Sequence, residues 1–152
     1  MNKFTKLLSL SLILGLTLLF SCKKDDAPEN NGGKTAKFTI TVNGINVNDD
    51  YASFVIVGGD YAQSKTVWKV NGVERSNELG IGLDEDDFAG STKTYVIEST
   101  KPLNVITAGI QCINYNAAYT ISYKAEINGQ VVTNEQNISV AAGKDYTHDF
   151  QY

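Results

Sequence analysis

The acidic run DEDD at residues 84–87 is the segment of this 152-residue sequence best suited to hold a cation. Calcium takes six to eight oxygen ligands, which Asp and Glu side chains can supply. An EF-hand loop aligned to begin at Asp84 does not fit the sequence. Asp86 falls correctly at the third position, but the required Gly is missing and Tyr95 stands where the bidentate Glu belongs. A charge run is also typical of a solvated loop. We therefore expect a solvated loop, and whether Asp84, Asp86 and Asp87 bind calcium in another geometry stays open.

Few residues suit catalysis. His148 is the one histidine, so any Ser–His or Cys–His mechanism would need it, yet it alternates with Tyr146 and Phe150 as in a packed strand. Cys112 shares a strand face with apolar residues and is expected to be a small buried hydrophobe. The glycines of the segment 80–82 do not begin a dinucleotide-binding fingerprint. We expect no catalytic residue, no cofactor and no metal site, and a protein that is not an enzyme.

The aromatic residues raise the question of a carbohydrate ligand, which binds by stacking on planar rings. The chain has 8 Tyr, 6 Phe and 1 Trp, and most alternate inward in the predicted strands, so core packing accounts for them. Tyr61, Phe88 and Tyr115 fall in predicted loops and are the candidates for such a contact. The 17 acidic residues do not reveal a pair of carboxylates placed for glycoside hydrolysis, so a small surface hydrolase is kept only as an alternative.

The N-terminus has the layout of a secretory signal peptide over residues 1–21. Lys3 and Lys6 are followed by an apolar stretch over residues 7–20 and then by Ser21, directly before Cys22. The apolar stretch is shorter than the roughly 20 residues that a membrane-spanning helix needs.

The segment Leu19-Phe20-Ser21-Cys22 resembles the lipobox of bacterial lipoproteins. The resemblance implies that the signal peptide is cleaved before Cys22 and that the thiol of this residue carries a lipid. Residues 23–26 (KKDD) are similar to the short export signal of surface lipoproteins of the Bacteroidota. What these likenesses imply is a palmitate-type anchor at Cys22 in the outer membrane, with the protein exposed at the cell surface.

Composition and charge fit one exported domain behind a tether. Residues 22–36 (CKKDDAPENNGGKTA) lack apolar periodicity and predict a flexible tether. The formal net charge of −4 removes the electrostatic basis for binding nucleic acid. We expect the membrane to be contacted through the lipid anchor and a protein or glycan to be the possible ligand.

Residues 37–152 show the period-two alternation of antiparallel strands, for example over residues 119–127. Asn-Gly pairs at residues 43–44, 71–72 and 128–129 predict tight turns. Strands are expected at residues 37–42, 51–58, 65–70, 78–83, 92–99, 103–112, 119–127, 131–140 and 145–151. Short strands with frequent turns predict an all-β fold consisting of a single antiparallel β-sandwich.

Trp68, in the segment TVWKVNGV, resembles the buried Trp on the third strand of immunoglobulin-like domains, with Thr66 and Val70 facing inward beside it. Transthyretin-like sandwiches are the alternative. Together these features predict a lipid-anchored envelope protein that acts as a binding or accessory module with an unspecified ligand. The alternatives are the small hydrolase and a purely structural envelope protein.

Overall fold

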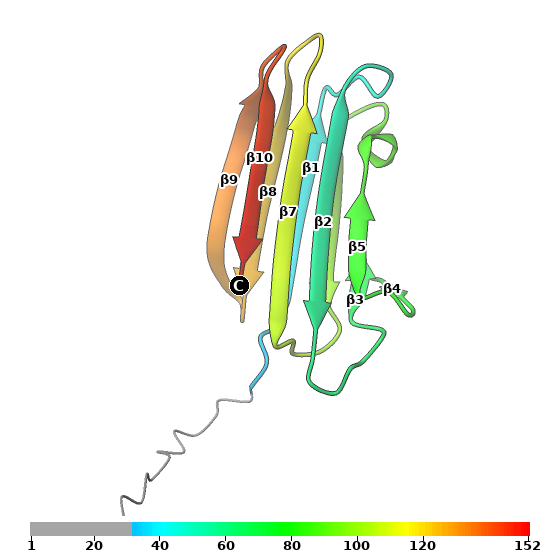
Figure 1. Ribbon diagram of the computed structural model, residues 1–152, viewed down its shortest axis with the longest axis vertical. Helices are drawn as coiled ribbons and strands as arrows, with labels where there is room; N and C mark the ends of the chain where they lie inside the picture. Colours follow the sequence, from blue (N-terminus) through cyan, green and yellow to red (C-terminus); the bar gives the residue numbers. More distant parts are fainter. Residues whose placement is uncertain (1–31) are drawn as a thin grey trace, which may run out of the picture.

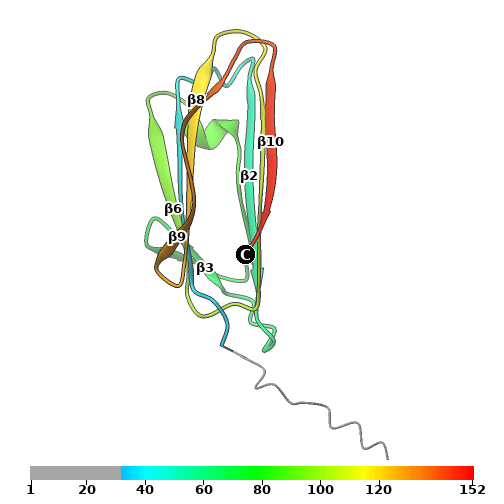
Figure 2. The same cartoon turned by 90° about the vertical axis from the view of Figure 1, so that its left-hand side faces the viewer.

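The computed structural model describes residues 32–152, which fold into two antiparallel β-sheets packed face to face as a sandwich (Figures 1 and 2). Ten strands and one short 3-10 helix follow each other along the chain: β1 (Ala36–Asn43), β2 (Tyr51–Gly59), β3 (Trp68–Val70), β4 (Val73–Arg75), β5 (Gly80–Leu83), η1 (Glu85–Phe88), β6 (Lys93–Ser99), β7 (Val105–Ile113), β8 (Tyr119–Ile127), β9 (Gln130–Val140) and β10 (Asp145–Gln151). The all-β sandwich predicted from the sequence is thus confirmed.

The strand order cannot be guessed from the order of the strands along the chain. The six-stranded sheet has the order β4-β3-β6-β1-β8-β9, and the four-stranded sheet has the order β10-β7-β2-β5. Consecutive strands β1 and β2 lie in different sheets, so the Asn43-Gly44 pair begins a crossover loop and not a hairpin. The other two Asn-Gly pairs join neighbouring strands, and both residues of each pair have positive φ, as a tight hairpin turn requires.

The core lies between the sheets and is built from alternate residues of the central strands. In β1 and β8 the buried positions alternate with exposed or half-buried ones, which is the pattern of a strand with one face on the core. Phe38 lies at the centre, with its ring near those of Trp68 and Tyr123 (both centroid distances 6.1 Å).

Trp68 is fully buried, as expected, and donates a hydrogen bond from Nε1 to the carbonyl oxygen of Leu79 (3.0 Å). The indole occupies space that is free because residue 58 is Gly: a Cβ atom there would lie 2.5 Å from the Trp68 ring and 2.6 Å from Leu103. The strand expected at residues 65–70 begins only at Trp68, and Val67 is buried where Thr66 was predicted to face inward. The immunoglobulin-like and transthyretin-like variants of the sandwich stay predictions.

The sandwich has two distinct ends (Figure 1). The acidic end is formed by the loops at residues 44–50, 84–92, 114–118 and 141–144. The opposite end, called the tether end here, holds the first described residues and the C-terminus. At the tether end Lys34 pairs with Leu103 through two main-chain hydrogen bonds (2.7 and 2.9 Å), so the chain is fixed to the domain two residues before β1 begins.

Candidate functional site

The acidic run lies at the acidic end, where it forms η1 together with Phe88. Asp84 caps this helix: its Oδ1 accepts a hydrogen bond from the Asp86 amide (3.1 Å), and Asp87 Oδ2 accepts one from the Asp84 amide (3.0 Å). This reciprocal pattern is a capping box, which satisfies main-chain donors that the helix start leaves free. Two of the three aspartates considered as calcium ligands thus have structural roles.

Phe88 holds η1 against the core. Its side chain is 1% exposed and packs edge-to-face on Phe54 (5.5 Å between centroids) and Tyr95 (5.4 Å). The expectation that Phe88 is a loop aromatic available to a ligand is therefore wrong. A residue in an apparent loop becomes a core residue here because a single helical turn directs it inward.

The acidic end also contains two carboxylates with buried oxygen atoms. Asp50 is only 4% exposed and accepts hydrogen bonds from the main-chain amides of Tyr115 (3.0 Å) and Asn46 (3.2 Å). The Oε2 atom of Glu85 is buried and has no hydrogen-bond partner within the described residues. Burying a carboxylate oxygen without a partner is costly, so this atom requires a compensating cation or donor.

The buried hydroxyl of Tyr119 lies within electrostatic range of both carboxylates. It donates a hydrogen bond to the carbonyl oxygen of Tyr51 (2.9 Å). Burial is the main cause that raises the pKa of this hydroxyl; the neighbouring Cys112 thiol raises it further, and the charges of Asp50 and Glu85 add to the effect. Asp50 and Glu85, which are 35 positions apart in the sequence, thus both act on the same buried hydroxyl.

This region can supply only part of a cation site through its side chains. Among residues 32–152 no group of three or more His, Cys, Asp or Glu side chains is placed to hold a metal ion. Calcium, however, accepts main-chain carbonyl oxygens and water as well as carboxylates. The buried oxygen of Glu85, which has no partner among the described residues, and the buried carboxylate of Asp50 can contribute to such a mixed ligand set.

The remaining residues singled out in the sequence are scattered. Tyr61 is 78% exposed at the tether end, and Tyr115 is 66% exposed at the acidic end. Tyr51, which sequence reasoning missed, is 36% exposed and follows Asp50 directly. Its position at the start of a strand with alternating burial is the signal that could have identified it.

Cys112 and His148, considered as nucleophile and base, lie on the neighbouring strands β7 and β10, but their side chains form no hydrogen bond with each other. His148 is exposed on β10 and its ring stacks on that of Phe150 (4.2 Å between centroids, 8° between planes). Cys112 is free and fully buried on β7, and burial raises the pKa of its thiol to about 11. A buried thiol with a raised pKa is a poor nucleophile.

Cys22 and the signal peptide at residues 1–21 lie outside the described residues. Within the described part of the chain no helix is long and apolar enough to cross a membrane.

A sequence model of the family described as "PLAT/LH2 and C2-like Ca2+-binding lipoprotein" matches residues 2–141, and the chain belongs to this family. The match begins within the predicted signal peptide and extends through most of the sandwich, so it covers the residues of the predicted leader as well as those of the fold. The family description names calcium binding and no reaction. No curated protein matches the sequence.

Solved structures with a similar fold include proteins from Parabacteroides and Bacteroides species. The calcium-bound form of a protein from Parabacteroides distasonis is 15% identical, with a TM-score of 0.61, over 84% of this chain and 98% of that chain. A domain of unknown function from Bacteroides vulgatus (14% identical, TM-score 0.56) and a protein from Bacteroides ovatus (14%, 0.53), both of the DUF4425 family, each align over 80% of this chain and 94% of theirs. At such low identity these likenesses show the fold alone.

Proposed function

We propose that this member of the PLAT/LH2 and C2-like lipoprotein family is a calcium-binding accessory module that is anchored to the outer membrane by a lipid on Cys22 and exposed at the cell surface. The role is one of binding, not catalysis. The proposal extends the prediction from the sequence by naming the ion and the end of the sandwich that holds it.

The buried Oε2 atom of Glu85, without a partner in the described residues, is the observation that carries the calcium part of this proposal. Asp50 and Glu85 would hold the ion, and the other ligands would be main-chain carbonyl oxygens of the surrounding loops and water. Calcium would neutralise the negative charges of the two carboxylates. The calcium-bound neighbour from Parabacteroides distasonis supports the choice of ion.

The anchor part rests on the lipobox resemblance at residues 19–22 and on the family match, which includes this leader. A lipid with two or three acyl chains on one residue holds a protein stably, since each buried CH₂ contributes about 0.8 kcal/mol. The protein has a negative net charge and is not attracted electrostatically to an anionic membrane surface. The lipid therefore has to provide the attachment.

Titration calorimetry of the purified full-length protein with calcium chloride tests the proposal, with magnesium chloride as the competing ion. We expect saturable binding of calcium at about one ion per chain. Asp50→Asn should abolish it, whereas Glu74→Gln, an exposed carboxylate on β4 at the other end of the sheet, should leave it unchanged. Absence of heat with calcium up to millimolar concentration would refute the calcium part.

A further inference from the structure

The two outer faces of the sandwich differ in chemistry. The outer face of the six-stranded sheet carries charges of both signs, several of which are paired: Lys37 and Lys69 both contact Glu98 (3.8 and 3.5 Å), and Lys124 contacts Glu126 (3.0 Å). Exposed ion pairs of this kind contribute little to stability, and they already engage several of the charges on this face.

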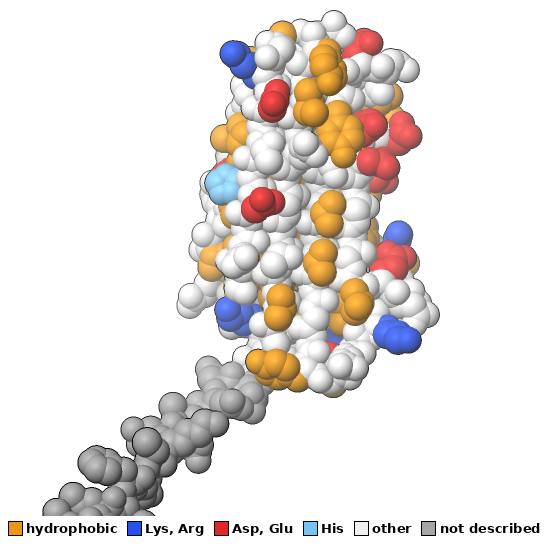
Figure 3. Space-filling model, in the orientation of Figure 1, with side chains coloured by type: hydrophobic (Ala, Val, Ile, Leu, Met, Phe, Trp, Pro, Cys, Tyr) orange, Lys and Arg blue, Asp and Glu red, His pale blue; other side chains and the backbone are white. Residues whose placement is uncertain are grey.

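The outer face of the four-stranded sheet carries no Lys or Arg at the strand positions that point outward. Its charges are the carboxylates of Asp145 and Asp149, and its valines Val55, Val57 and Val105 are 44, 42 and 58% exposed. In Figure 3, which looks onto this face, hydrophobic side chains form a line along β2 with polar surface beside them. No element of the described chain covers this face.

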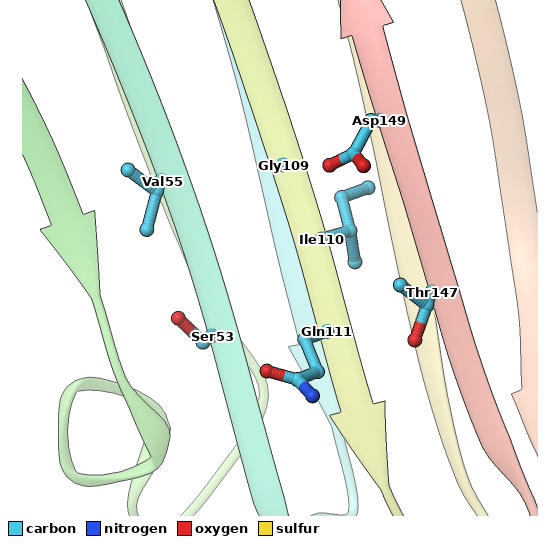
Figure 4. A pocket seen from close by; sticks show the side chains of 7 residues that line it. All are labelled: Ser53, Val55, Gly109, Ile110, Gln111, Thr147 and Asp149. Atoms are coloured by element: carbon cyan, nitrogen blue, oxygen red, sulfur yellow. The ribbon is translucent and has the colours of Figure 1, made fainter.

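A shallow trough of about 290 Å³ crosses the middle of this face (Figure 4). Its floor and walls follow from the strand register, which aligns Ser53 with Gln111 and Thr147 in one row, and Val55 with Gly109 and Asp149 in the next. A second hollow of about 420 Å³ shares the Val55–Gly109–Asp149 row and continues toward the tether end. Together they form one extended depression, called the trough below, along β2, β7 and β10.

The polar side chains of the trough have no partners of their own. Those of Ser53, Gln111, Thr147 and Asp149 make no hydrogen bond within residues 32–152, although hydroxyl, amide and carboxylate groups together offer both donors and acceptors. A hollow of similar size on the other sheet differs, because there Lys124 is ion-paired and Asn134 accepts a hydrogen bond from Gln136 (2.8 Å). The trough is therefore the face with unused hydrogen-bonding capacity beside exposed apolar surface.

We propose that the trough binds a neutral polysaccharide chain. Sugar rings present C–H faces that suit the valines and hydroxyl edges that suit the unpartnered polar groups, and an elongated depression suits a linear polymer. The two carboxylates and the missing cations disfavour nucleic acid and anionic lipid surfaces. A second copy of this chain fits less well, because the same face of the second chain offers no Lys or Arg to pair with the carboxylate of Asp149 that the contact would bury.

Tyr51 extends the trough toward the acidic end. It lies on the same face of β2 as Ser53 and Val55, is exposed, and pairs in register with Ile113. An aromatic ring at the end of such a trough offers a platform on which a terminal sugar can stack. Because the trough itself contains neither Asp50 nor Glu85, binding there does not depend on calcium.

The test is a pull-down of the full-length protein in detergent with insoluble neutral polysaccharides (xylan, mannan, β-glucan and starch), in EDTA and in calcium. Gly109→Val fills the trough with a β-favouring side chain, at a position where a Cβ would contact only the end of Asp149 (3.2 Å). Gln111→Ala removes a polar partner, and Thr39→Val on the opposite sheet is the control. Thermal melting of each variant establishes that the fold is kept.

We expect at least one of the four polymers to bind in EDTA, with a loss of tenfold or more in Gly109→Val and in Gln111→Ala and no loss in Thr39→Val. The proposal is overturned if none of the polymers is retained, or if the folded trough variants bind as well as the parent protein. Binding to DNA or to phosphatidylglycerol vesicles, or self-association that Gly109→Val abolishes, would likewise overturn it and identify the other occupant. Failure of calcium binding alone leaves this result unaffected, so the two proposals fail separately.

Discussion

Replacing Glu85 by Gln should have opposite effects on stability with and without calcium. In EDTA the wild-type protein buries a carboxylate oxygen that has no partner in the described residues. An unsatisfied buried polar atom costs about 1–3 kcal/mol, and the neutral amide lessens this cost, so Glu85→Gln should melt at an equal or slightly higher temperature than the parent protein.

In calcium the order should reverse. Calcium at 100 times the dissociation constant stabilises the folded state by about 2.7 kcal/mol, and a tenfold loss of affinity lowers this to about 1.4 kcal/mol. With about 4 °C of melting temperature per kcal/mol for a domain of this size, the calcium-induced shift should fall from about 11 °C in the parent to about 6 °C in Glu85→Gln. Scanning fluorimetry in EDTA and in calcium measures both numbers, with Glu74→Gln as the matched control. If Glu85→Gln is destabilised in EDTA and keeps the full calcium shift, Glu85 does not contact the ion and the reasoning from its buried oxygen is wrong.

Three further predictions concern the core and the anchor. Gly58→Ala forces a Cβ to within 2.5 Å of the Trp68 ring, so it should destabilise the fold by about 1–3 kcal/mol in urea melts, whereas Gly59→Ala, which meets no atom within 4 Å, should cost less. The pKa of Cys112 is raised to about 11 in the folded state, so its thiol stays neutral while the unfolded chain ionises from about pH 9. The free energy of unfolding should therefore fall as pH rises between these values, and urea melts at several pH values should show the advantage of the parent over Cys112→Ala shrinking by about 2 kcal/mol. Cys22→Ala should lose its label when cells are grown with radiolabelled palmitate and should leave the membrane fraction; a variant that keeps both would disprove the lipid assignment.

The sequence was sufficient to place most of the strands, because each central strand has one face on the core and alternates accordingly. The strand at residues 119–127 was predicted with its observed bounds, and the Asn-Gly pair that follows turns into β9 as expected. The order of the strands within the two sheets could not be predicted from the sequence. It depends on which strand crosses to the other sheet, and the Asn43-Gly44 pair looks locally like a hairpin although its strands never pair.

The candidate site was only half visible in the sequence for a related reason. The acidic run drew attention to residues 84–87, but its aspartates were expected to matter more than Glu85. In the structure Asp84 and Asp87 are used as helix caps, and Glu85 is the member with a buried free oxygen. Asp50 lies 35 positions before Glu85, directly after Asp49, and becomes relevant only because the sandwich brings β2 and η1 together. The trough was also invisible, since Gly109 and Asp149 meet only through the pairing of β7 with β10.

The chain enters the domain at the end opposite the loops that carry Asp50 and Glu85. From Cys22 to Lys34 the polypeptide can stretch to about 40 Å at most, and a strand of 11 residues such as β9 is already about 36 Å long before its loops are added. Under the proposed lipid attachment at Cys22, this reach is comparable to the length of the sandwich, so the tether end would be held near the bilayer and the acidic end would face away from it. A partner of the proposed calcium site would then approach from the side of the domain that faces away from the membrane.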